Sequence, residues 1–249
     1  MSLIETESLV LKTYGLSEAD RIVVFLTHDH GVIRGVAKGA KRLKSRFGST
    51  LEPFSEVRLT YFQKDAVELV SIRDIELRRS GFHIAGNPML LQRFAYLTEL
   101  LLIFLPPHDP NEKVFRLVRE CFRASASDNE EAAALTAYFE IWLLKLSGFM
   151  PNWKDCGQCG EAITDVGPCA LLPDMHLSCS KCSSARGARP LTGDLPKAFR
   201  ASQRMGVGDF IGSVSNSSSL SELIAILERL LERAAGRSLP KETSLGLAD

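Results

Sequence analysis

The sequence predicts an α+β protein with more than one domain, and three features of its 249 residues support this fold class. Short runs rich in β-branched and aromatic residues fill the first third of the chain. Apolar residues then recur at helical spacing, and pairs of cysteines interrupt this helical part. Hydrophobic residues make up 45% of the chain, which is enough for packed cores and argues against global disorder.

Residues 1–80 are predicted to form a small β-barrel domain. A hairpin turn at His28-Asp29-His30-Gly31 joins the second and third strands, with glycine where a positive φ is needed. Five short strands in about 75 residues are typical of an OB-fold barrel, although an SH3-like barrel fits the strand count almost as well. The expected strands are Ile4–Lys12, Ile22–Thr27, Val32–Lys38, Glu56–Phe62 and Val67–Ile75.

Residues 81–249 are predicted to form an α-helical domain. The first helix ends at Pro106-Pro107, and the third begins at the loop 125–129, where Glu130 and Glu131 suit the positive end of the helix dipole. Ser213–Ser219 is interpreted as a flexible link before the last helix, and the final dozen residues as a mobile tail. The expected helices are Met89–Leu105, Asn111–Arg123, one through Leu135, Tyr138, Trp142 and Leu146, Leu195–Arg204 and Leu220–Ala235.

Neither a secretory signal nor a membrane span is expected. The N-terminal residues MSLIETESLV carry two acids and no basic segment. The longest apolar run, Met89–Leu105, contains charged residues and is shorter than the roughly 20 residues that cross a bilayer. We therefore expect a cytoplasmic protein, in a compartment where disulfides are rare.

Two C-x-x-C pairs, Cys156–Cys159 and Cys179–Cys182, are separated by 19 residues. Two residues between cysteines form a tight turn that directs both sulfurs to one ion, and Gly157 and Gly160 suit such a turn. Four thiolates complete a tetrahedron without an open position, so the pattern predicts one structural zinc ion per chain in a knuckle insert, residues 153–189. A redox dithiol is the alternative that a single pair would leave open.

The other residues near this motif have simpler interpretations. Cys121 lies in an expected helix and is interpreted as a small buried residue. Cys169 lies between the two pairs without a partner motif of its own. His176 precedes Cys179 by three residues and is an alternative metal ligand.

The stretch RGVAKGAKRLKSR, residues 34–46, carries six positive charges and no acid in a chain of formal net charge +0. Binding to a polyanion would therefore have to come from this local patch. A solvated loop would usually mix charges of both signs, and an apolar strand residue such as Val36 does not suit a targeting signal. The stretch therefore predicts a phosphate-contacting loop that contains Lys38, Lys41, Arg42, Lys44 and Arg46.

This basic stretch would leave the third strand at the face where OB-folds hold single strands. Phe47, Tyr61 and Phe62 are candidates for base stacking, although Tyr61 and Phe62 alternate along a strand and only one of them can face out. Gly35 and Gly39 would let the backbone approach a ligand closely. The chain has no phosphate-binding glycine loop, no H-E-x-x-H motif and no carboxylate-rich metal site, so we expect no enzyme.

The order of these motifs resembles the bacterial recombination mediator family RecO. The resemblance rests on SLVLKTYGLSEADRIVVFLTHDHG at 8–31, GVIRGVAKGAKRLKSRFGSTLEPFSEVRLTYF at 31–62 and LLKLSGFMPNWKDCGQCG at 143–160, followed by CSKC. It implies an N-terminal OB-fold, a helical domain and a zinc knuckle. It also implies binding to single- and double-stranded DNA without sequence preference, with annealing of complementary strands. The positions that match the family's DNA contacts are Arg34, Lys38, Lys41, Arg42, Lys44 and Arg46.

The same resemblance implies two protein partners, RecR and the single-strand binding protein, whose displacement lets the recombinase load. The C-terminal tail of the single-strand binding protein would dock on the helical domain. Two alternatives stay open from the residues alone: another zinc-ribbon OB-fold factor acting in transcription or on RNA, and a protein-interaction adaptor whose basic stretch binds an acidic surface.

Overall fold

The structure is a computed structural model that describes residues 2–63, 68–163, 168–191, 195–215, 217 and 219–240. The chain divides into two compact units, one containing the residues up to Arg123 with Pro240, the other Ala124–Leu239. The first unit extends beyond the predicted barrel, so the domain boundary after residue 80 stays a prediction. Val67, Asn216, Ser218 and the tail after Pro240 lie outside the described residues.

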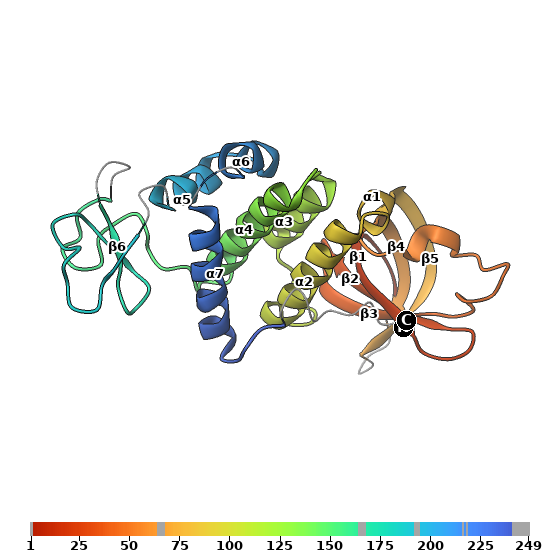
Figure 1. Ribbon diagram of the computed structural model, residues 1–249. Helices are drawn as coiled ribbons and strands as arrows, with labels where there is room; N and C mark the ends of the chain where they lie inside the picture. Colours follow the sequence, from red (N-terminus) through yellow and green to blue (C-terminus); the bar gives the residue numbers. More distant parts are fainter. Residues whose placement is uncertain are drawn as a thin grey trace. The chain divides into compact units, whose positions relative to one another are not determined.

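The first unit begins with a closed five-stranded barrel of the OB type (Figure 1). The strand order around the barrel is β1-β2-β3-β5-β4, and β3 and β5 are the one parallel neighbouring pair among these described strands. This order confirms the predicted OB-fold. The strands are β1 (Ser2–Gly15), β2 (Arg21–Thr27), β3 (Gly31–Ala37), β4 (Glu56–Gln63) and β5 (Leu69–Arg79).

Alternating apolar side chains fill the barrel. The first half of β1 pairs with β4 and the second half with β2, and a register shift between Val10 and Lys12 lets the long strand serve both neighbours. Because side chains alternate across a strand, one set from each strand faces inward. The interior is lined by Val10, Val23, Phe25, Ile33, Val57, Leu59, Tyr61, Val70 and Ile72.

The β2–β3 hairpin closes on Gly31, whose φ is +65°. A Cβ built there would lie 2.4 Å from the carbonyl oxygen of Asp109. The chain passes this close because the N–H of His108 donates to the carbonyl of Val32 at 3.1 Å. Both the backbone conformation and the space therefore require glycine.

Replacing Gly31 with alanine should lower the free energy of unfolding by about 3 kcal/mol, because left-handed strain adds to a steric overlap. Gly48→Ala is the matched control, since Gly48 also has a positive φ of +48° but nothing within 4 Å of its Cβ position. It should cost only about 1 kcal/mol. Urea unfolding followed by circular dichroism measures both, and equal losses would contradict the steric part of the argument.

Among the described residues, the first unit also contains the 3-10 helix η1 (Gly48–Leu51) and the α-helices α1 (Phe82–Ala85), α2 (Pro88–Phe104) and α3 (Glu112–Arg123). Asn87 caps α2 by accepting from the N–H groups of Met89 and Leu90. The rings of Phe54, Phe94 and Phe122 pack with centroids 5.4–5.6 Å apart. This aromatic cluster joins the segment before β4 to α2 and α3, and so fixes both helices on the barrel.

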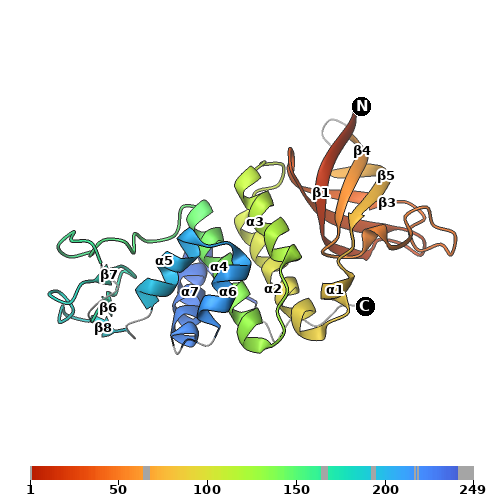
Figure 2. The same ribbon diagram turned by 90° about the horizontal axis from the view of Figure 1, so that it is seen from above.

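The second unit is a bundle of α4 (Asn129–Leu146), α5 (Leu195–Arg204), α6 (Val207–Val214) and α7 (Leu220–Ala235), with α5–α7 gathered around α4 (Figure 2). Asp128 caps α4 by accepting from the N–H of Glu131 at 2.8 Å, which confirms the predicted start. Tyr138 and Phe210 pack with centroids 5.3 Å apart.

Helix α6 corrects one prediction, because Ser213 and Val214 belong to its last turn and not to a flexible link. Phe210, Ile211 and Val214 are buried there, so tertiary packing outweighs the weak helix propensity of the glycine- and serine-rich sequence. Across the described residues, every helix is too short or too polar to cross a membrane.

Candidate nucleic-acid interface and metal centre

Most of the predicted basic residues lie in one loop, residues 38–46, which follows β3; this segment is called the basic loop below. The loop is anchored on the β1–β2 connection at one end of the barrel. Lys41 donates its backbone N–H to Ala19 at 2.9 Å and its Nζ to the carbonyl of Ser17 at 2.8 Å. The N–H of Gly39 donates to Asp20 at 2.8 Å. These bonds hold the loop at a fixed place on the barrel.

The six predicted cations do not form one group. Lys38, Arg42 and Lys44 are exposed and make no ion pair with any described residue. Arg46 donates to the carbonyl of Ile72 at 3.3 Å, and its guanidinium lies 4.8 Å from the centre of the Phe47 ring. Arg34 lies within β3 and pairs with Glu68 at 3.5 Å. The structure thus gathers five cations in the loop and leaves Arg34 paired on the strand.

The prediction that these aromatic residues stack on bases is largely wrong. Phe47 and Tyr61 are each 1% exposed and belong to the barrel core. Burial also raises the pKa of Tyr61 to about 12. Only Phe62 keeps a partly open ring, which carries Arg73 at 5.7 Å. The strand period explains the error, since Tyr61 faces inward and Phe62 outward.

The sequence reasoning missed three exposed apolar residues at the same barrel end: Tyr14, Leu16 and Leu43. Leu43 lies between Arg42 and Lys44 in the basic loop and is fully exposed. An apolar residue isolated in an otherwise polar loop is the signal that could have identified it. The basic loop therefore offers apolar contact area beside its charges.

Gly35 and Gly39, which were predicted to let the backbone approach a ligand, have different roles in the structure. A Cβ on Gly35 would lie 2.8 Å from Ile72, so this glycine serves packing inside the barrel and not approach to a ligand. Gly39 has a φ of +73° and begins the turn of the basic loop. Its role is to direct the chain away from β3.

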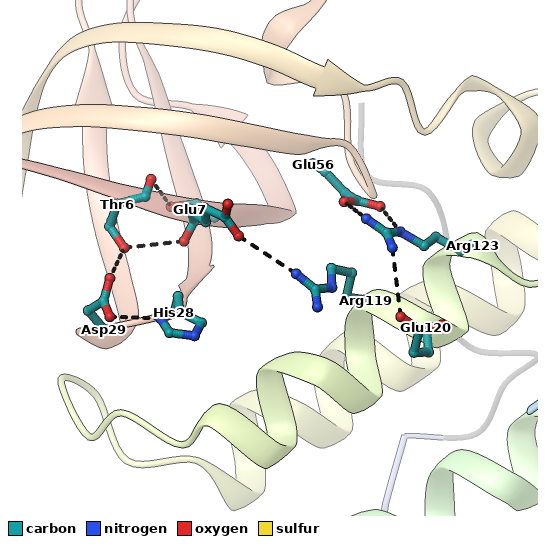
Figure 3. Close-up of polar contacts among 9 residues, drawn as sticks. Thr6, Glu7, His28, Asp29, Glu56, Arg119, Glu120 and Arg123 are labelled. Carbon is teal, nitrogen blue, oxygen red and sulfur yellow. Dashed lines mark hydrogen bonds and ion pairs between the residues drawn. The ribbon is translucent and has the colours of Figure 1, made fainter. Parts of the chain in front are cut away.

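The polar residues of the hairpin turn His28-Asp29-His30 have structural roles within the first unit. Asp29 accepts hydrogen bonds from His28 at 2.7 Å and from Thr6 at 2.9 Å, as drawn in Figure 3. These bonds, that of His28 first, lower the pKa of the Asp29 carboxyl. The His28 ring packs edge-on against Phe115 at 5.3 Å. The turn thus fixes the hairpin to β1 and α3.

In the second unit, the four predicted cysteines Cys156, Cys159, Cys179 and Cys182 converge, with all Sγ atoms within 4.8 Å of one another. The Sγ atoms of Cys159 and Cys179 are 3.7 Å apart. A tetrahedral ion with metal–sulfur bonds of about 2.3 Å requires sulfur separations of about 3.8 Å. The cluster therefore fits one metal ion bound by four thiolates.

Tight turns and short strands build this cluster. In the first turn, Gly160 has a φ of +76° and donates its N–H to Cys156 at 2.9 Å. In the second, the N–H of Cys182 donates to Cys179 at 3.0 Å. Strands β6 (Ala170–Leu171), β7 (Leu177–Ser178) and β8 (Arg189–Pro190) form the small sheet that returns the second pair to the first.

The electrostatics of the cluster favour a thiolate at Cys156. Burial acts to raise the pKa of this thiol, but the backbone N–H groups of Cys179, Cys159 and Gln158 lower it to about 6. A preformed nest of N–H groups around a sulfur is typical of metal knuckles. Hydrogen bonding to the Cys159 sulfur and burial instead raise the pKa of the Cys182 thiol to about 12, so the four sulfurs do not equally favour the thiolate.

The remaining candidates lie outside the cluster. Cys121 is buried in α3, as predicted, and burial raises its thiol pKa. Cys169 is also buried. His176 is not among the four clustered ligands; its Cβ occupies the space that a side chain at Gly157 would need, 2.8 Å from the Cβ position. Gly157 is therefore required by close packing.

Two family models match the chain. The model described as "Recombination protein O N terminal" matches residues 1–80, which is the barrel, and "Recombination protein O C terminal" matches residues 94–243. Together these segments include the basic loop and all four clustered cysteines. The residues that carry the sequence resemblance therefore lie inside the matched segments.

The chain is also similar to individual proteins of the same family. The DNA repair protein RecO of Koribacter versatilis is 33% identical over 161 residues, which cover 65% of each chain. That of Bifidobacterium adolescentis is 32% identical over 67% of this chain and 68% of the relative. That of Dehalococcoides mccartyi is 26% identical over 88% of this chain and 85% of the relative. The aligned segment thus spans about two thirds of the first two relatives and most of the third.

Proposed function

We propose that this chain, which belongs to the RecO family of DNA repair proteins, binds single- and double-stranded DNA without sequence preference through its basic loop. The observation that carries the proposal is the exposure of Lys38, Arg42 and Lys44 without acidic partners among the described residues. Because duplex and single strands share the phosphate backbone, such cations bind both forms without reading bases.

The proposed mechanism is annealing by charge neutralisation. Two complementary strands repel each other, and cations that contact both backbones raise the local concentration of one strand near the other. This step breaks no covalent bond and consumes no nucleotide, so we propose a mediator that is not an enzyme. Tyr14, Leu16 and Leu43 lie where unstacked bases could contact them beside the phosphates.

The family membership supports further proposals about partners. We propose that the chain acts with RecR and with the single-strand binding protein at the nucleoid, and helps to replace the latter by the recombinase. The barrel would hold the DNA, and the helical part after residue 80 would supply the protein contacts, among them one for the C-terminal tail of the single-strand binding protein. Arg34 is the least favourable of the six predicted DNA contacts because it already pairs with Glu68.

For the metal centre we propose zinc. A closed set of four cysteine ligands suits a d¹⁰ ion that prefers tetrahedral sulfur coordination, and it leaves no position for a substrate. When bound, the ion would supply structural cross-linking and no catalysis. Cys156, Cys159, Cys179 and Cys182 would hold it.

Titrating salt in a binding assay tests the DNA proposal. If the five cations of the basic loop each neutralise one phosphate, the plot of log affinity against log salt should have a slope of about −3.5 for single strands and about −4.5 for duplex. Fluorescence anisotropy with two unrelated oligonucleotides in each form measures it. A preference for one sequence above tenfold, or affinity that does not depend on salt, would favour a different nucleic-acid factor or a protein adaptor.

A further inference from the structure

A cleft of about 300 Å³ in the first unit lies where α3 meets the edges of β1, β4 and β5. Its charged lining has more positive than negative groups: Arg58, Arg78, Arg119, Arg123, Glu7 and Glu56. Strand β1 runs from the cleft to the basic loop, beside which it ends at Gly15. Glu7 in the cleft and Gly15 are eight residues apart, which is about 26 Å along an extended strand. The cleft is therefore separate from the basic loop on the same barrel.

Three of the four arginines already have carboxylate partners at hydrogen-bond distance. Arg123 donates to both oxygens of Glu56, at 2.7 and 2.6 Å. Arg58 lies 3.3 Å from Glu5, and Arg78 lies 2.9 Å from Glu76. Arg123 therefore serves mainly to join α3 to the barrel, and the other two are held by exposed ion pairs that are individually weak.

Arg119 differs from these three. It extends from α3 toward Glu7 (Figure 3), but its Nη1 is 3.6 Å from the carboxylate, beyond a hydrogen bond. Its Nε is buried and has no hydrogen-bond partner among the described residues. The guanidinium lies 5.6 Å from the centre of the Phe115 ring, one helical turn earlier. The buried Nε and the ring contact thus hold Arg119 in place, while the side chain stays 27% exposed, so that its outer nitrogens can meet a bound anion.

We infer that this cleft is a second phosphate-binding site for a nucleic-acid strand, with Arg119 as its main donor. The inference rests on the proposed function, since it requires a chain that binds nucleic acid. A guanidinium fork matches the two oxygens of a phosphate. Arg58 and Arg78 would contribute only when the phosphate draws them from their weak, exposed ion pairs with Glu5 and Glu76. The basic loop and this cleft would then be two separate phosphate-binding sites on one barrel. One molecule would contact the nucleic-acid backbone at two separated phosphates.

The lining also argues against an acidic peptide as the ligand. Peptides dock through apolar or aromatic anchors that fill pockets. The apolar residues of this cleft, Leu9, Val57 and Phe115, are 0%, 1% and 2% exposed, so they offer no apolar surface to an anchor. A phosphate group binds through charge and hydrogen bonds and needs no apolar anchor.

Two substitutions of the same ion pair test the inference: Arg119→Gln and Glu7→Gln. Each removes the Arg119–Glu7 attraction, and R119Q also removes the contact with the Phe115 ring. The melting temperature of each variant separates this structural loss from the loss of a phosphate contact. If Arg119 binds phosphate, R119Q should weaken binding of a labelled dT20 oligonucleotide about fivefold and reduce the salt slope by about 0.7. E7Q should leave the affinity unchanged or raise it, because it removes a competing carboxylate.

The assay uses the full chain, with a thermal melt of each variant. Equal weakening by R119Q and E7Q in step with lower melting temperatures would make the pair a structural clamp and overturn the inference. Wild-type binding that neither variant changes would overturn it while the proposed function stands. Loss of binding to poly-glutamate in R119Q, with dT20 binding intact, would assign the cleft to acidic peptides instead. If the wild type binds no DNA, the proposed function fails, and the inference fails with it.

Discussion

Reversing the charge of Lys41, Arg42 and Lys44 to glutamate should lower the affinity for single-stranded DNA by about 100-fold or more at 0.1 M salt. The substitutions remove three attractive charges and add three repulsive ones in a loop that carries no acid to offset them. The melting temperature should change little, because the three side chains are exposed and only Lys41 makes a side-chain hydrogen bond, to the carbonyl of Ser17. Anisotropy and a thermal melt on the same preparations measure both effects.

A variant with the same change in net charge provides the control. Lys197, Arg229 and Arg233 are exposed on α5 and α7 in the second unit, and their replacement by glutamate alters the total charge identically. If binding depended on net charge alone, both triple variants would weaken it equally. DNA affinity that survives the loop reversal would show that the basic loop is not the binding surface.

The sequence was sufficient to predict the barrel because its pattern is local. Alternating apolar residues, the turn at His28–Gly31 and the strand count together led to the OB topology that the structure shows. The four cysteines were equally predictable, since a fixed spacing around two turns leaves the sulfurs few other arrangements. Both predictions depend on short-range geometry.

What the sequence could not supply is the partner of each residue across the fold. Tyr61 could be assigned to the core from its alternation with Val57 and Leu59, but the burial of Phe47 against the barrel could not be read from any local pattern. The cleft around Arg119 is assembled from α3 and three strands, and no motif in the sequence marks it. Helix α6 was missed because its stability comes from burying Phe210 against α4 and not from its own propensity.

Removal of the metal should unfold the knuckle, residues 153–189, and this is the largest stability effect we expect in the second unit. The insert has only two-residue strands among its described residues, so the four-thiolate cluster is its main cross-link. Structural zinc contributes about 10–16 kcal/mol to the folding of comparable small domains. Freshly prepared protein should contain about one zinc per chain, and replacing Cys156 by serine should abolish it.

Trp153 provides the readout for this unfolding. It is 0% exposed, donates its indole N–H to the carbonyl of Met175 at 2.8 Å and packs against Phe199 of α5 at 5.4 Å. Both contacts depend on a folded knuckle, so a strong chelator or Cys156→Ser should shift tryptophan emission to longer wavelength. Cys169→Ala is the matched control, because Cys169 is buried in the same insert but lies outside the cluster. It should keep the metal and the emission spectrum, whereas a Cys156–Cys159 disulfide in metal-free, folded protein would show a redox site instead.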